Sequence, residues 1–90
     1  MANDLTFTAP LMQSGDYKDR FRAEYWQTKI RYQKLHNMCV KYEADTLDFK
    51  PSCPLELLKR QKAAMGQYLN CLEIRAEIEG IKLLYEQEKE

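Results

Sequence analysis

The 90-residue sequence lacks several features that mark common classes of protein. It has no run of about 18 apolar residues, so we expect no transmembrane helix and no membrane partner. Its first 16 residues contain no basic segment followed by an apolar core, so we expect no secretory signal and a cytoplasmic location. The 14 basic and 14 acidic residues cancel. This balance argues against general nucleic-acid binding, which depends on excess positive charge.

The residues that metal sites and many enzymes need are also scarce. The three cysteines, Cys39, Cys53 and Cys71, contain no CxxC pair, which argues against a disulfide framework or a zinc site. His36 is the one histidine, and nothing besides its i, i+3 spacing to Cys39 supports a Cys–His pair. The three glycines lie far apart, so there is no glycine-rich phosphate loop. We predict no metal, no cofactor and no enzymatic activity.

What the sequence does have is two long helical patterns. From Asp16 to Ala44 it contains neither proline nor glycine, and Asp16 suits the position that caps a helix N-terminus. Apolar and aromatic residues follow at alternating steps of four and three, which is the spacing of one helix face. They are Phe21, Tyr25, Thr28, Tyr32, Leu35, Cys39 and Tyr42.

A second helix is predicted to begin at Pro54 and to run to about Glu79. Proline suits the first helical position, and Gly80 either ends the helix or lets it continue weakly towards residue 90. Residues 45–53 form the linker, and residues 1–15 read as an irregular arm. The predicted fold is therefore all-α: one domain, residues 16–90, forming an antiparallel two-helix hairpin.

In a hairpin of this kind the two helices contact each other along one seam only. The apolar face of each helix is wider than that seam, so part of it stays uncovered. Small chains often need partners to complete a core. We therefore predict a homo-oligomer, and the sequence does not decide between a dimer, a tetramer and a hexamer.

Three polar residues of the second helix stand out. One apolar set recurs every seven residues: Leu58, Met65 and Leu72. A polar set recurs at the same interval, three residues further along: Gln61, Tyr68 and Arg75. We interpret these as two positions of one seam, which places long polar side chains in an apolar stripe. The pattern leaves three interpretations open. These side chains set the register of an oligomer, pair with acidic residues such as Glu24 across an interface, or line a ligand pocket.

The start of the first helix interleaves basic and aromatic side chains. Arg22, Tyr25, Trp26 and Lys29 are the central members of this group. Aromatic rings stack on bases, while Arg and Lys bind phosphates, so the composition suits a nucleotide pocket. The alternative is that the aromatic residues are core and the basic residues are its solvated flank.

The second helix carries a pattern that resembles small phage-encoded helical-hairpin proteins. Its members here are Leu57, Leu58, Gln61, Ala64, Met65, Tyr68, Leu69, Leu72 and Arg75. With the basic-aromatic helix before it, this stretch is similar to the hairpin domain of phage anti-CBASS and anti-Thoeris sponge proteins. The likeness covers about residues 19–79. The linker is richer in proline than that pattern, and residues 1–15 lie outside it.

The resemblance implies a phage anti-defence protein in the host cytoplasm. Such a protein assembles as an oligomer, often a hexamer, and sequesters a cyclic nucleotide or cyclic ADP-ribose-type immune signal without cleaving it. The implied ligand-binding residues are Arg22, Tyr25, Trp26, Lys29, Gln61, Tyr68 and Arg75. Other classes remain open: a helical adaptor or virion accessory protein with no small ligand, or a protein–protein inhibitor of a host enzyme.

Overall fold

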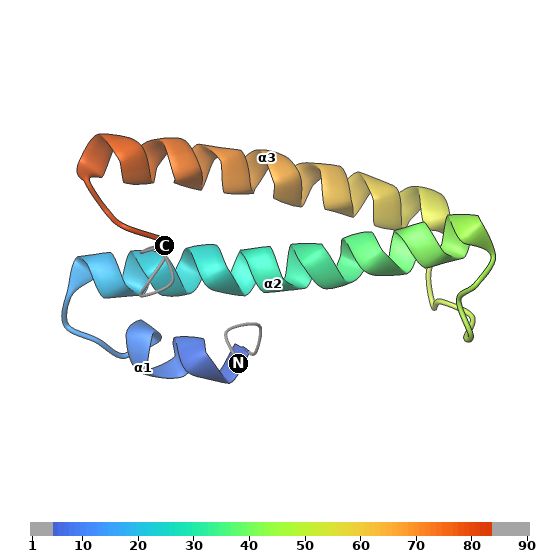
Figure 1. Ribbon diagram of the computed structural model, residues 1–90, viewed down its shortest axis with the longest axis horizontal. Helices are drawn as coiled ribbons and strands as arrows, with labels where there is room; N and C mark the ends of the chain where they lie inside the picture. The colour runs from blue at the N-terminus through green and yellow to red at the C-terminus, as the bar shows by residue number, and fades with distance from the viewer. Residues whose placement is uncertain (1–4, 84–90) are drawn as a thin grey trace, which may run out of the picture.

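The long helices of the computed structural model lie side by side and run in opposite directions (Figure 1). The structure describes residues 5–83. The elements in chain order are the short 3₁₀ helix η1 (Leu5–Thr8), α1 (Ala9–Met12), α2 (Tyr17–Ala44) and α3 (Leu55–Glu79). Residues 5–83 contain no strand, which confirms the all-α prediction. Neither long helix is apolar over enough of its length to cross a membrane.

Local signals in the sequence explain where α2 begins and ends. The Asp16 side chain accepts a hydrogen bond from the Lys18 backbone N–H at 3.1 Å, which satisfies one free donor of the first turn. At the other end Asp45 takes a left-handed conformation with φ of 64°. Aspartate tolerates this region better than most residues, because its short side chain can bond locally.

Helix α3 begins after Pro54 and ends at Gly80, whose φ is 71°. A left-handed glycine is a common helix stop, since it has no Cβ to clash. The chain then turns back rather than continuing: residues 81–83 are not helical, and Ile81 is buried. Of the two alternatives that the sequence leaves open, the structure shows the end at Gly80 and no helical continuation over residues 81–83; residues 84–90 lie outside the described residues.

Residues 5–12 form helical turns, where the sequence predicts an irregular arm. Thr8 is buried, and its hydroxyl donates to the Leu5 carbonyl at 2.6 Å, closing the first turn. The Gln27 amide of α2 donates to the same hydroxyl, and Phe7 meets Trp26 edge-to-face at 6.2 Å. Elements η1 and α1 pack against α2 because these tertiary contacts stabilise turns that are too short to form alone.

The seam between α2 and α3 differs from the predicted one by a single residue. The side chains of α3 that are buried or half-buried against α2 alternate steps of four and three. They are Leu58, Lys62, Met65, Leu69, Leu72 and Ala76. Gln61, Tyr68 and Arg75 are exposed beside this seam, so their predicted place inside it is wrong. One residue corresponds to a rotation of about 100° around a helix, which is enough to turn a side chain out.

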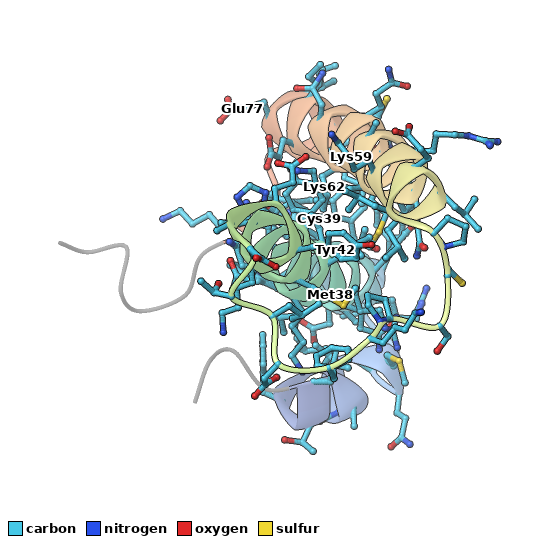
Figure 2. The ribbon with its side chains drawn as sticks, turned by 90° about the vertical axis from the view of Figure 1, so that its right-hand side faces the viewer. Met38, Cys39, Tyr42, Lys59, Lys62 and Glu77 are labelled. Carbon is cyan, nitrogen blue, oxygen red and sulfur yellow. The ribbon has the colours of Figure 1, made fainter. Side chains whose placement is uncertain are left out.

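The buried core lies near the end of the helix pair where α2 begins and α3 finishes. Its buried members come from both helices and from the returning segment: Phe21, Tyr25, Leu69, Leu72, Ala76 and Ile81. Towards the linker, α3 contributes the half-buried Leu58, Lys62 and Met65 to the seam. Viewed from the linker end, Cys39 and Lys62 lie between the two helices, and Met38 lies towards the N-terminal segment (Figure 2).

Candidate functional site

The seven residues predicted to bind a ligand lie on two different sides of the helix pair. The Tyr25 hydroxyl donates to Glu73 at 2.8 Å, whereas Arg75 donates to the Tyr17 hydroxyl at 2.8 Å. Residues 73 and 75 are about 200° apart around α3, so these contacts flank the seam from opposite sides. We call the side with Tyr25 and Glu73 the groove side, and the side with Arg75 and Tyr17 the Arg75 side.

The groove side contains an open cavity of about 510 Å³. Its lining comes from α2, the end of α3 and the returning segment: Tyr25, Glu73, Ala76, Glu77, Ile81, Lys82 and Leu83. The wall formed by residues 81–83 depends on two predicted site residues. The Trp26 ring N–H donates to the Leu83 carbonyl at 2.6 Å, and Arg22 Nε donates to the Lys82 carbonyl at 2.5 Å. Both side chains therefore build the groove by binding its main chain.

Tyr25 lines this groove and is 6% exposed as a residue. Burial and the hydrogen bond to the Glu73 carboxylate raise the pKa of Tyr25 well above its ordinary value of 10.0. The phenol therefore stays protonated and donates to Glu73 throughout the physiological range.

Further along the groove side, aromatic and basic side chains form a second feature, which we call the aromatic–basic cluster. It consists of Lys29, Tyr32, His36 and Lys62. The Tyr32 and His36 rings stack with centroids 6.3 Å apart and planes 9° apart. Lys62 Nζ lies 3.1 Å from His36 Nδ1, so the ammonium donates to that ring nitrogen. Lys29 precedes Tyr32 by one helical turn on the same face.

Lys29 differs from the other predicted cation on this side. Arg22 makes an ion pair with Asp19 at 3.0 Å and is mostly buried. Lys29 is half-buried, and within residues 5–83 its ammonium has neither an ion pair nor a hydrogen bond. A cation without a protein partner is available to an anionic ligand.

Gly66 lies opposite this cluster, in the middle of α3. A Cβ built there would meet the Tyr32 ring carbon Cε1 at 3.5 Å. The nearest neighbour of this mid-helix glycine is therefore an aromatic ring of α2, not another backbone. Because 3.5 Å is an ordinary contact distance, packing does not require glycine at this position.

The Arg75 side holds the three remaining predicted residues. The Arg75 guanidinium lies 4.9 Å from the Phe21 ring centroid and 3.4 Å from the Glu79 carboxylate, besides its bond to Tyr17. Tyr68 is 41% exposed, and Gln61 is exposed beside Met65. One ligand cannot contact both these residues and the groove of the same chain, because the packed seam lies between them.

The seven predicted residues leave out four residues of the groove side: Tyr32, His36, Lys62 and Glu73. Lys62 has a signal in the sequence, since it follows Leu58 by four residues and so shares its face. His36 and Glu73 gain their roles through contacts across the helix pair, for which no local spacing is diagnostic. No group of three or more metal-ligating side chains occurs in the described part of the chain.

Comparison with known protein families places the chain in a family. The model of the Sequestin family matches residues 15–78, which span α2 and nearly all of α3. All seven predicted site residues and the aromatic–basic cluster lie within the match. No curated protein and no solved structure matches the chain.

Proposed function

The chain belongs to the Sequestin family, and from this premise we propose that it binds and sequesters a small signalling nucleotide without cleaving it. The family name indicates a sequestering function. The resemblance to phage sponge proteins supports the more specific role: a phage anti-defence protein that removes a cyclic nucleotide or cyclic ADP-ribose-type immune signal in the host cytoplasm.

We place the ligand on the groove side of the helix pair. The observation that carries this placement is the Lys29 ammonium, which has no ion pair or hydrogen bond within residues 5–83 and lies one turn from the stacked Tyr32 and His36 rings. Cations and aromatic faces at this spacing suit a phosphate beside a base. Lys62, which contacts His36, supplies the second cation.

The open cavity next to the cluster suits the nucleoside part of the ligand. Glu73 and Glu77 line it, and carboxylates accept hydrogen bonds from ribose hydroxyls and base amino groups. The two carboxylates outnumber the one lysine of the lining, Lys82, so a phosphate is favoured less there than beside Lys29 and Lys62. In this arrangement Arg22 and Trp26 hold the wall, and Tyr25 positions Glu73.

Self-association remains part of the proposal. Gln61, Tyr68 and Arg75 lie on the Arg75 side, where they reach a ligand or a register contact only together with a second chain. An oligomeric helical adaptor with no small ligand is the second candidate function. The observation that favours it is the exposure of apolar residues on α3, among them Leu57 (44%), Ile74 (52%) and Ile78 (78%).

A titration calorimetry panel tests the ligand. Cyclic dinucleotides, cyclic trinucleotides and cyclic ADP-ribose isomers are titrated into the wild type, Lys29→Glu and Lys62→Glu. A hydrogen bond to a charged group is worth about 1.5–3 kcal/mol, so each variant should bind about 10- to 100-fold more weakly. Lys34→Glu is the matched control, since it makes the same charge change about 140° around α2 from Lys29. Absence of binding by every member of the panel, or equal loss in the control, overturns the proposal.

A further inference from the structure

Trp26 is the one tryptophan of the chain, and its side chain contacts two segments that lie far apart in the sequence. Phe7 of η1 meets the indole edge-to-face, with ring centroids 6.2 Å apart and planes 60° apart. The indole N–H donates to the Leu83 carbonyl at 2.6 Å. One side chain of α2 thus contacts both the N-terminal segment and the wall of the groove.

The remaining side-chain bonds between the N-terminal segment and α2 fall on the neighbouring residue, Gln27. Its amide donates to the hydroxyl of the buried Thr8 at 3.1 Å and lies 2.6 Å from Met12 Sδ. The Phe7 ring falls on Trp26 itself. Substitution can therefore remove the contact with Trp26 and the contact with Gln27 separately.

The wall of the groove, residues 81–83, is main chain without helical structure. Ile81 is buried, and its N–H donates to the Ala76 carbonyl at 2.9 Å. At the far end of the wall, the Leu83 carbonyl accepts from Trp26. An indole that turned would carry its N–H away from this carbonyl, so the orientation of the Trp26 ring sets the position of the wall. An edge-to-face partner favours one ring orientation over others.

We propose that Phe7 is a positioning residue for the groove: it holds the Trp26 ring so that the indole N–H keeps the wall at Leu83 in place. The inference deepens the proposed function and rests on it for the nucleotide. By linkage, a segment that stabilises the wall raises the affinity of a ligand that contacts the wall, and the ligand in turn stabilises docking of the segment. Phe7 and Leu83 both lie outside the family match to residues 15–78, so family membership does not imply this path.

Hydrogen exchange measured by NMR tests the path without any ligand. The Ile81 N–H is protected by its bond to Ala76 and exchanges when the wall lifts. Phe7→Ala removes the ring contact, and Trp26→Phe removes the indole donor. An aromatic pair or a neutral hydrogen bond corresponds to about a 2- to 10-fold change in an equilibrium, so each variant should speed this exchange by about that factor. Unchanged exchange in Phe7→Ala overturns the inference.

Two control variants separate the path from docking of the segment as a whole. Phe7→Tyr keeps the aromatic ring and should exchange like the wild type. Met12→Ala removes a contact with Gln27 and leaves Phe7 and Trp26 in place, so it should also exchange like the wild type. Equal acceleration by Met12→Ala and Phe7→Ala overturns the path through Trp26.

The fluorescence of the single tryptophan gives a spectroscopic signature. Phe7→Ala opens the indole to water, so its emission should shift to longer wavelength, whereas Phe7→Tyr should not shift it. Emission that stays unchanged in Phe7→Ala shows that Phe7 does not hold the ring, and it overturns the inference.

A double-mutant cycle connects the path to the groove. The cyclic dinucleotides, cyclic trinucleotides and cyclic ADP-ribose isomers of the calorimetry panel are titrated into the wild type, Phe7→Ala, Trp26→Phe and the double variant. Phe7→Ala should raise the dissociation constant about 2- to 10-fold in the wild type and leave it unchanged in the Trp26→Phe background. Equal losses in both backgrounds overturn the path. If no nucleotide binds the wild type, the proposed function fails, and hydrogen exchange still decides whether Phe7 holds the wall.

Discussion

At the scale of single residues, the Tyr25 hydroxyl joins the two long helices beside the groove. It donates to Glu73 at 2.8 Å from a residue that is only 6% exposed. The bond links helix packing to the proposed ligand site, because the same carboxylate lines the cavity. A change at this hydroxyl should therefore alter stability and ligand binding together.

Tyr25→Phe should lower the free energy of unfolding by about 1 kcal/mol, because it removes one partly buried hydrogen bond and leaves the ring packing intact. Urea denaturation monitored by circular dichroism measures this loss. Tyr68→Phe is the matched control: Tyr68 is 41% exposed and makes no hydrogen bond within the described residues, so its stability should not change. Equal losses in the two variants would contradict the role assigned to Tyr25.

The raised pKa of Tyr25 predicts a pH dependence. Folded protein holds the phenolic proton more tightly than unfolded protein, whose tyrosines titrate near pH 10. The stabilisation is therefore fully present below about pH 10 and is lost as the pH rises above it. Unfolding measured at pH 9 and at pH 11 should show the wild type losing its advantage over Tyr25→Phe. A constant difference between the two proteins would count against this explanation.

Lys62 shows what residue-level reading of the sequence could and could not predict. The heptad spacing places Gln61, three residues after Leu58, in the seam, and the structure shows Gln61 exposed beside it. The spacing alone cannot distinguish the residue at i+3 from the one at i+4, because both lie close to the face of Leu58. The structure assigns the i+4 partner, Lys62, to the seam with α2, where its stem is half-buried and its ammonium reaches His36.

At the scale of elements, α3 contains a glycine that packing does not demand. A mid-helix glycine costs about 1 kcal/mol relative to alanine. Because the nearest atom to a Cβ at residue 66 is the Tyr32 ring carbon at 3.5 Å, a methyl group fits. The position faces the aromatic–basic cluster, so the missing side chain leaves the Tyr32 ring more accessible.

Gly66→Ala should therefore raise the free energy of unfolding by up to about 1 kcal/mol. Thermal unfolding followed by circular dichroism measures the gain. Gly80→Ala is the contrasting variant: with φ of 71° at the end of α3, it should destabilise the protein by about 1 kcal/mol. Destabilisation by Gly66→Ala would show that the two helices approach more closely than this structure has them.

The elements differ in how far their sequence specifies them. The observed limits of α2 and α3 fall within one residue of the predicted ones, because Asp16, Pro54 and Gly80 act locally. The helical turns of residues 5–12 were not predictable in this way. They are short, and the contacts that hold them, Gln27 to Thr8 and Phe7 to Trp26, join residues 19 positions apart.

At the scale of the whole molecule, α2 and α3 separate two surfaces with different chemistry. The groove side combines an open cavity with aromatic and basic side chains. The outer face of α3 carries exposed apolar residues and a row of polar ones. The proposal assigns the ligand to the first surface and self-association to the second, and it divides the seven predicted residues between them accordingly.

The central claim is that the protein holds a nucleotide signal and releases it unchanged. The direct measurement saturates the wild type with the ligand that calorimetry identifies, heats the complex to unfold it, and quantifies the released ligand by mass spectrometry. The account predicts a fixed stoichiometry of binding and full recovery of intact ligand. Conversion of the ligand to a product that a heated ligand-only control lacks would contradict it, as would the absence of any bound ligand.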